Sequence, residues 1–161
     1  MTDKGQNTSI SAAEETTGFL LWQAANGWQR LMRNALADLK LTHVQFVLLA
    51  GINHLAAKGK PVTQNAIAAH AGTDKMMTSK VLRTLENKSL IIRDKHEKDT
   101  RARSLSLTPE GELILAKAAK VVHHIDLTFF RLPLKNARVL NSVLTELNRR
   151  AHTGLSMPDM P

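Results

Sequence analysis

Two short stretches of this sequence concentrate side chains that bind anions. The first, RDKHEKDTRAR at residues 93–103, holds five Lys or Arg residues among three acids. The second, DKMMTSKVLR at residues 74–83, sets Lys and Arg beside the hydroxyls of Thr and Ser. Lys and Arg bind phosphate and carboxylate oxygens, and short hydroxyl side chains add further hydrogen bonds. These residue types predict recognition of an anionic partner rather than bond-making chemistry.

The positive charge of the chain is concentrated around these two stretches. The 161 residues include 22 Lys and Arg against 14 Asp and Glu, which makes a formal net charge of +8. Residues 58–103 alone hold 11 of the cations and 5 of the acids, a net charge of +6. A charge that only kept the protein in solution would be spread more evenly. The distribution therefore indicates a partner such as nucleic acid or a membrane surface.

Other classes of protein are not indicated by the sequence. It contains no glycine-rich phosphate loop, no G-x-S-x-G, no H-E-x-x-H and no cysteine nucleophile, so we do not expect an enzyme or a cofactor. No apolar run reaches the roughly 18 residues that span a bilayer. The first residues lack the basic-then-apolar pattern of a signal peptide. We therefore expect a cytoplasmic protein.

The spacing of apolar residues predicts a mainly α-helical fold with a small β-wing. Thr42 with Gln45 forms the capping box of a helix that Gly59 ends, and Thr63 begins a short helix that Gly72 ends. Another helix follows Thr73 or Asp74. Residues 90–107 change to the two-residue alternation of strands and predict a hairpin with a charged tip. Residues 108–131 form a long helix, and a last helix precedes the polar end of the chain.

The middle third of the chain predicts a helix-turn-helix followed by a wing. Ala68 lets two helices approach closely, and Gly72 permits the positive φ of the turn. The second helix suits the major groove of DNA, where its first residues meet base edges. Lys75 and Lys80 then contact phosphate or guanine, while Arg83 grips phosphate. The remaining candidates at the groove are Thr73, the short donors Thr78 and Ser79, and Met76, which can contact a thymine methyl group.

The order of these motifs resembles the MarR family (multiple-antibiotic-resistance regulators). The most specific matches are Asp99-x-Arg101 and the run from Leu107 to Gly111, LTPEG. The resemblance implies a homodimer in which Arg101 reaches the minor groove and Asp99 orients the wing, and we include Lys98 and Arg103 in the same contact. One departure is Ser89, because the family often has glycine before the first wing strand.

The terminal helices agree with a dimer. The segment 113–130 is apolar on nearly every side and needs more partners than one small head supplies. A two-fold dimer predicts a pseudo-palindromic operator in double-stranded DNA with half-sites about 10 base pairs apart. The expected organisation is a flexible tail over 1–15, an N-terminal dimerisation helix over 16–41, a winged helix-turn-helix head over 42–107, C-terminal dimerisation helices over 108–151 and a flexible tail over 152–161.

Members of the family commonly bind small aromatic or anionic effectors between the dimer helices and the head. The resemblance implies a repressor released by such a ligand, and the residues placed to line its site are Trp22, Trp28, Arg30, His43 and Phe46. Two alternatives remain open. A metal-responsive regulator of the same fold would use histidines such as His123 or His124, although we assign no metal ligand, and basic charge alone also suits a winged-helix module that binds RNA or protein.

Overall fold

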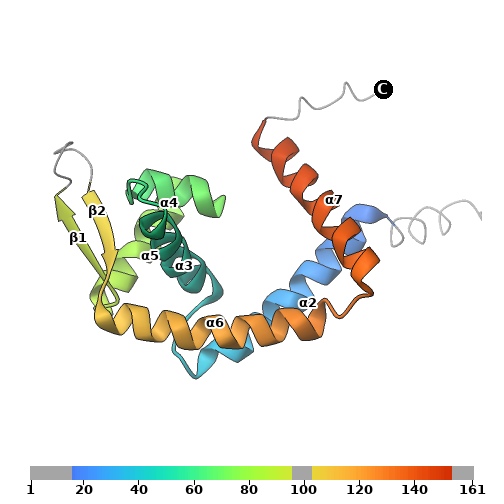
Figure 1. The fold of residues 1–161 in the computed structure, drawn as a ribbon, viewed down its shortest axis with the longest axis horizontal. Helices are drawn as coiled ribbons and strands as arrows, with labels where there is room; N and C mark the ends of the chain where they lie inside the picture. Colours follow the sequence, from blue (N-terminus) through green and yellow to red (C-terminus); the bar gives the residue numbers. More distant parts are fainter. Residues whose placement is uncertain (1–15, 96–102, 154–161) are drawn as a thin grey trace, which may run out of the picture. The chain divides into compact units, whose positions relative to one another are not determined.

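The structure, a computed structural model, describes residues 16–95 and 103–153. Its elements follow the order α2–α3–α4–α5–β1–β2–α6–α7 (Figure 1). Their bounds are α2 Thr17–Ala37, α3 His43–Ala57, α4 Gln64–Ala71, α5 Lys75–Asn87, β1 Ile91–Lys95, β2 Arg103–Leu107, α6 Pro109–Phe129 and α7 Leu134–His152. The chain divides into two compact units, one ending at Ile125 and one beginning at Asp126. No described helix has the length and apolar character needed to cross a membrane.

Side-chain caps start the helices of the first unit at the predicted residues. The Thr42 hydroxyl accepts from Gln45 N at 3.3 Å, and the Gln45 side chain accepts from Thr42 N at 3.2 Å, which completes the capping box. Thr63 caps α4, and Asp74 rather than Thr73 caps α5. Each cap satisfies a backbone N–H that has no partner inside the helix. The predicted helix starts are therefore confirmed.

The core of the first unit lies where α2, α3, α4, α5, the strands and α6 meet. Met32 and Leu36 of α2 are fully buried, so the N-terminal helix contributes directly to the core of the head. The other buried apolar residues of this cluster are Leu41, Leu48, Leu49, Ile52, Leu55, Ile67, Leu82, Leu85, Leu90, Ile91, Leu105, Leu115, Ala118 and Val122. Although glycine is unfavourable inside a helix, α2 continues through Gly27 without a break.

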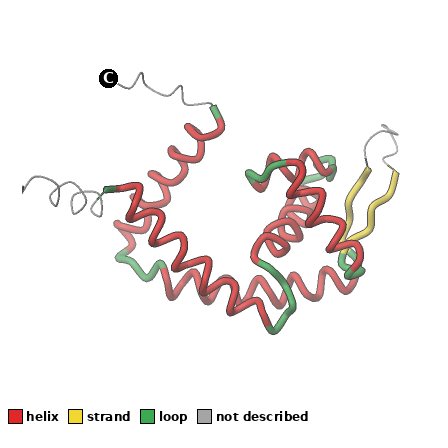
Figure 2. Tube along the Cα trace, turned by 180° about the vertical axis from the view of Figure 1, so that it is seen from behind, coloured by secondary structure: helices red, strands yellow, loops and turns green. Residues whose placement is uncertain are grey.

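The wing is the predicted antiparallel hairpin with one addition. Its two strands lie side by side (Figure 2), with Ile91 paired to Leu107 and Lys95 to Arg103. Leu105 is buried while Ser106 is exposed. Leu105 N also donates to Val62 O at 2.8 Å, and Thr63 forms an isolated bridge with Ser104. The residues before α4 therefore pair with the far side of β2 and attach the wing to the helix pair, which the sequence did not predict.

The turn before β1 has Ser89 in the left-handed conformation, which glycine adopts more easily than serine. Ser89 has φ 56°, its N–H donates to Glu86 O at 2.8 Å, and Leu90 N donates to Leu85 O at 3.0 Å. This pattern is the Schellman motif, whose left-handed residue is most often glycine. Serine there raises the free energy of the turn by about 1–2 kcal/mol. The turn keeps the geometry that glycine would adopt, at some expense in stability.

The start of α6 is bonded to the residues that lead into the wing. Thr108 N donates to Leu90 O at 3.1 Å, and the Thr108 hydroxyl donates to Ser89 O at 2.7 Å. The same hydroxyl accepts from Gly111 N at 3.0 Å and so caps α6, as predicted. Farther along, Leu115, Ala118 and Val122 are buried, whereas Leu113 and Leu127 are exposed. A single chain therefore buries only some of the apolar side chains of α6.

The second unit consists of the end of α6 and the helix α7. No described side chain of α7 is buried, and its exposed apolar residues are Leu134, Val139, Val143 and Leu147. Glu146 accepts hydrogen bonds from Arg149 and Arg150 at 2.7–2.8 Å. These hydrogen bonds lower the pKa of Glu146 to about 2, so the carboxylate stays ionised at neutral pH. The helix therefore carries these ion pairs beside an exposed apolar stripe made by Val139, Val143 and Leu147.

Candidate nucleic-acid interface

Helix α5 has one face in the core and one in solvent. Leu82 and Leu85 are fully buried against α3, α4 and β1, while Lys80 and Arg83 are exposed. Residues three, four and seven apart share one side of a helix. The exposed side is therefore a single stripe made by Met76, Lys80, Arg83 and the half-buried Ser79.

The turn that places α5 is held by short hydrogen bonds. Gly72 ends α4 at φ 64°, and Thr73 N donates to Ala68 O at 3.0 Å. The Asp74 side chain then accepts from Met77 N at 2.8 Å and begins α5. Positive φ is the conformation glycine adopts without steric strain. The helix-turn-helix predicted from Ala68 and Gly72 is present.

Thr78 belongs to this turn and not to the exposed stripe. Its side chain is 0% exposed, and its hydroxyl donates to Asp74 O at 2.7 Å. The Thr73 and Thr78 hydroxyls lie 2.8 Å apart and share a hydrogen bond. The prediction that Thr78 is a donor to DNA is wrong, because position 78 faces the core. Thr73 is half-buried in the same small network, so its hydroxyl braces the turn as well.

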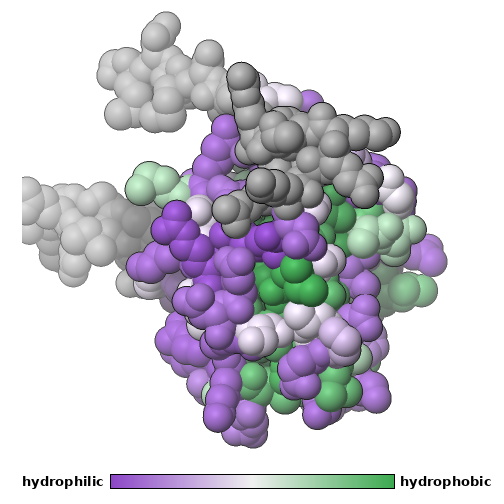
Figure 3. Space-filling view, turned by 90° about the vertical axis from the view of Figure 1, so that its left-hand side faces the viewer, coloured by the Kyte–Doolittle hydropathy of each residue, from purple (hydrophilic) through white to green (hydrophobic). Residues whose placement is uncertain are grey.

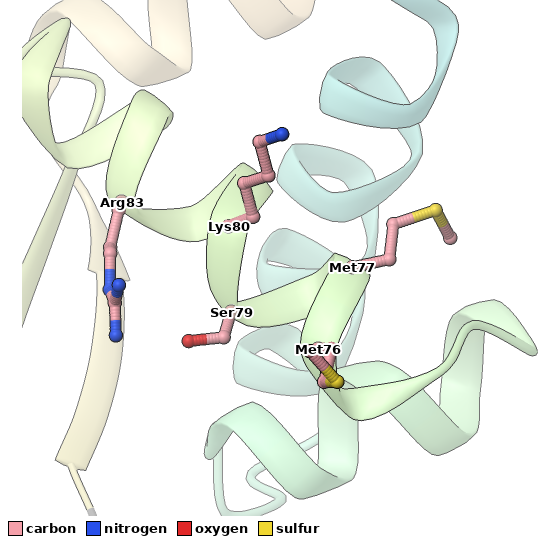
Figure 4. Close-up of a pocket in the computed structure, with 5 residues that line it drawn as sticks. All are labelled: Met76, Met77, Ser79, Lys80 and Arg83. Atoms are coloured by element: carbon pink, nitrogen blue, oxygen red, sulfur yellow. The ribbon is translucent and has the colours of Figure 1, made fainter.

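The exposed stripe of α5 is mixed in chemistry. Figure 4 shows the five side chains that line a shallow hollow along the helix, with Ser79 and Arg83 pointing to the same side. The lining residues are Met76, Met77, Ser79, Lys80 and Arg83. Met76 is 85% exposed, which is unusual for an apolar side chain of its size. The hollow combines thioether and methylene groups with two cations and a hydroxyl.

Seen from the side that carries the wing strands, the first unit is largely hydrophilic around a central apolar patch (Figure 3). Within the wing, Arg103 is the first residue of β2. Lys98, Asp99 and Arg101 lie outside the described residues, so their predicted contacts stay predictions.

Arg93 connects the wing to both helices of the helix-turn-helix. Its side chain is 12% exposed, donates to Gln64 Oε1 at 3.3 Å, and lies 3.7 Å from the Glu86 carboxylate. Gln64 begins α4 and Glu86 stands near the end of α5. The guanidinium therefore holds three elements together. Sequence reasoning placed Arg93 in the charged stretch but did not find this role, since Gln64 lies 29 positions away in the chain.

Lys88 ties the end of α5 to the turn between α2 and α3. Its ammonium donates to Lys40 O at 2.6 Å and to Gln45 Oε1 at 3.2 Å. Gln45 is also a member of the capping box that begins α3. The position of α5 is thus coupled to the start of α3 and the end of α2.

An aromatic cluster lies beside that turn. The rings of Trp28 and His43 meet edge to face with centroids 4.8 Å apart, and His43 stacks with Phe46 at 6.5 Å. Three of the five predicted effector residues therefore come together. Among the described ring contacts the other two do not join them, so their place in the effector site stays a prediction. Trp22 is 63% exposed and stacks on Phe19, and Arg30 points away because two residues along a helix turn by about 200°.

A second pair of rings lies between α3 and α4. His54 and His70 stack with centroids 4.9 Å apart. The positive charge of Lys58 lowers the pKa of His54, with smaller contributions from desolvation, His70 and Lys60. The His54 imidazole is therefore neutral at neutral pH and adds no charge to the head. Among residues 16–95 and 103–153, no three His, Cys, Asp or Glu side chains gather in a way that could hold a metal ion.

Comparison with known proteins identifies the family. The chain is 42% identical over 137 residues to the uncharacterized HTH-type transcriptional regulator YdcH of Bacillus subtilis, covering 85% of this chain and 93% of that protein. Residues 41–102 match the model of the MarR family. The chain belongs to the MarR family.

Solved structures of MarR-family-like regulators share the fold. The crystal structure of the S. aureus MepR–DNA complex superposes with a TM-score of 0.76 at 23% identity, covering 83% of this chain and 97% of that one. CouR from Rhodococcus jostii RHA1, bound to p-coumaroyl-CoA, superposes with a TM-score of 0.74 at 21% identity, covering 83% and 92%. By its family, this MarR-family protein is a DNA-binding transcriptional regulator, and its fold is a winged helix-turn-helix.

Proposed function

We propose that this MarR-family protein is a homodimeric, sequence-specific repressor that a small aromatic or anionic molecule releases from its operator. The observation that carries the proposal is the two-sided recognition helix, α5. Its buried side is fixed by Leu82 and Leu85, and its other side presents the exposed Lys80 and Arg83 beside the half-buried Ser79. A helix held in this way can enter a major groove without rearranging.

The proposed DNA contacts are of two kinds: contacts to phosphates, which position the protein, and contacts to base edges, which read the sequence. Lys75, Lys80 and Arg83 are exposed cations that attract phosphates, and phosphate contacts supply most of the affinity. Ser79 and Met76 lie on the same side and meet base edges. The resemblance adds Arg101 in the minor groove, Asp99 orienting it, and Lys98 and Arg103 beside them. The DNA complex of MepR supports this mode of binding, because the two folds superpose.

The dimer is supported by apolar surface that one chain leaves in solvent. On α2 it comprises Leu20, Leu21, Trp22 and Leu31, and on α7 it comprises Leu134, Val139, Val143 and Leu147. Several large apolar side chains exposed on one helix, as on each of these two, indicate a protein interface. A two-fold dimer presents two recognition helices to one pseudo-palindromic operator, with half-sites about 10 base pairs apart.

The effector site is supported by the cluster of Trp28, His43 and Phe46. Aromatic rings and an imidazole suit a small aromatic or anionic molecule. CouR, which shares the fold, was crystallised with p-coumaroyl-CoA. Occupation of the cluster would act on α5 through the capping box of α3 and Lys88, whose bonds to Gln45 and Lys40 join these elements. The ligand then favours a dimer whose recognition helices are wrongly placed for DNA.

The proposed DNA binding is tested by selecting bound duplexes from a random pool. The most enriched duplex is then titrated with the protein at several salt concentrations. We expect a palindromic preference. Arg83→Ala and Lys80→Ala should weaken binding to all sequences alike and reduce the salt slope by about 0.9 for each phosphate that is no longer neutralised. Lys117→Ala on α6 removes an exposed cation elsewhere and should change neither quantity. A pool without enrichment, or an Arg83→Ala protein with an unchanged salt slope, would overturn the proposal.

The effector part is tested by repeating that titration with a panel of aromatic carboxylates. We expect at least one of them to weaken operator binding of the wild type, with a change in Trp fluorescence because Trp28 lies against His43. His43→Ala should bind the operator normally and lose the response. Release that is equally strong in His43→Ala would place the effector elsewhere.

A further inference from the structure

Met76 is the most exposed large apolar side chain among the described residues, at 85% of its surface. It lies in the first turn of α5, directly after the Asp74 cap. Leaving such a side chain in water forgoes the favourable free energy of apolar burial, about 25 cal/mol for each Å². Nothing within the head requires it, since the core side of α5 is already filled by Leu82 and Leu85.

The position of Met76 on the helix puts it where bases are read. It stands three, four and seven residues before Ser79, Lys80 and Arg83, so the four side chains share one side of the helix. The two cations bring that side against the DNA backbone, and the beginning of a recognition helix lies deepest in the groove. An apolar group is therefore carried to the base edges.

The major-groove edges of the four bases offer one apolar group, the C5-methyl of thymine; all their other distinguishing groups are hydrogen-bond donors or acceptors. We propose that Met76 is a specificity-determining residue that packs its thioether against the methyl group of a thymine in each half-site. This inference rests on the proposed DNA-binding function and adds the chemical group that is read. Met77 does not serve in this way, because it is turned by about 100° around the helix and is less exposed, at 39%.

The experiment removes the methyl group and the side chain separately. Each thymine of the selected operator is replaced in turn by uracil, which deletes only the C5-methyl group, and every duplex is titrated with wild type, Met76→Ala and Met77→Ala. Alanine is the best helix former, so both variants keep α5. Met77→Ala is the matched control, since it shortens the neighbouring side chain.

One position in each half-site is expected to respond. For the wild type and Met77→Ala, uracil there should weaken binding by roughly fourfold, the effect of burying about one methyl group. For Met76→Ala, thymine and uracil should bind equally well. An unchanged thymine preference in Met76→Ala, or no effect of uracil at any position, would overturn this inference while leaving the DNA-binding function intact. A protein that selects no duplex from the pool would overturn both.

Discussion

Gly111→Ala is expected to destabilise the protein by about 3 kcal/mol or more, because α6 approaches the backbone before β1 too closely for any side chain. A Cβ atom at position 111 would stand 2.0 Å from the carbonyl oxygen of Leu90. That oxygen accepts from Thr108 N, and the Thr108 hydroxyl binds both Ser89 O and Gly111 N. The strand and the helix could separate only by breaking these bonds.

The change in free energy is measured by urea denaturation followed by circular dichroism, at one protein concentration for all variants. Gly18→Ala is the matched control, since a Cβ atom there meets nothing within 4 Å and alanine favours a helix. We expect its stability to stay within about 1 kcal/mol of the wild type. Equal midpoints for Gly111→Ala and the wild type would show that α6 is not held against Leu90 in this way.

Val143→Glu is expected to convert the proposed dimer into monomers without unfolding the chain. Val143 is 49% exposed on the apolar side of α7, four residues from both Val139 and Leu147. In a two-fold interface one substitution places two carboxylates in apolar surroundings, each costing a few kcal/mol. The dimer dissociation constant should rise by at least roughly a hundredfold.

Sedimentation equilibrium measures this constant, and circular dichroism checks that the helices remain. Asn141→Glu adds the same charge on the opposite side of α7, since two residues turn a helix by about 200°, and should remain dimeric. Operator affinity should fall in Val143→Glu alone, because a monomer engages one half-site. If Val143→Glu stays a dimer at micromolar concentration, another surface holds the subunits together.

Local sequence patterns determined much of this protein. The caps at Thr42, Thr63 and Thr108 were predicted because they bond to N–H groups three residues away, and such contacts form in any context. The alternation of Ser and Leu in 104–107 predicted β2, because successive residues of a strand face opposite sides and one side is buried. Serine at position 89, in place of the glycine common in the family, suggested a different turn there, whereas the structure keeps the left-handed conformation. The helix-turn-helix, the wing and the exposed cations of α5 were therefore predictable from the sequence.

The tertiary structure decided which of those residues are free to act. Thr78 and Ser79 are neighbours of similar chemistry, yet only Thr78 is sealed in the core, because the orientation of α5 depends on how α3 and α4 pack against it. The bonds of Arg93 to Gln64 and of Lys88 to Lys40 join residues 29 and 48 positions apart. Sequence periodicity does not predict contacts between residues so far apart in the chain, because only the folding of the whole chain brings them together.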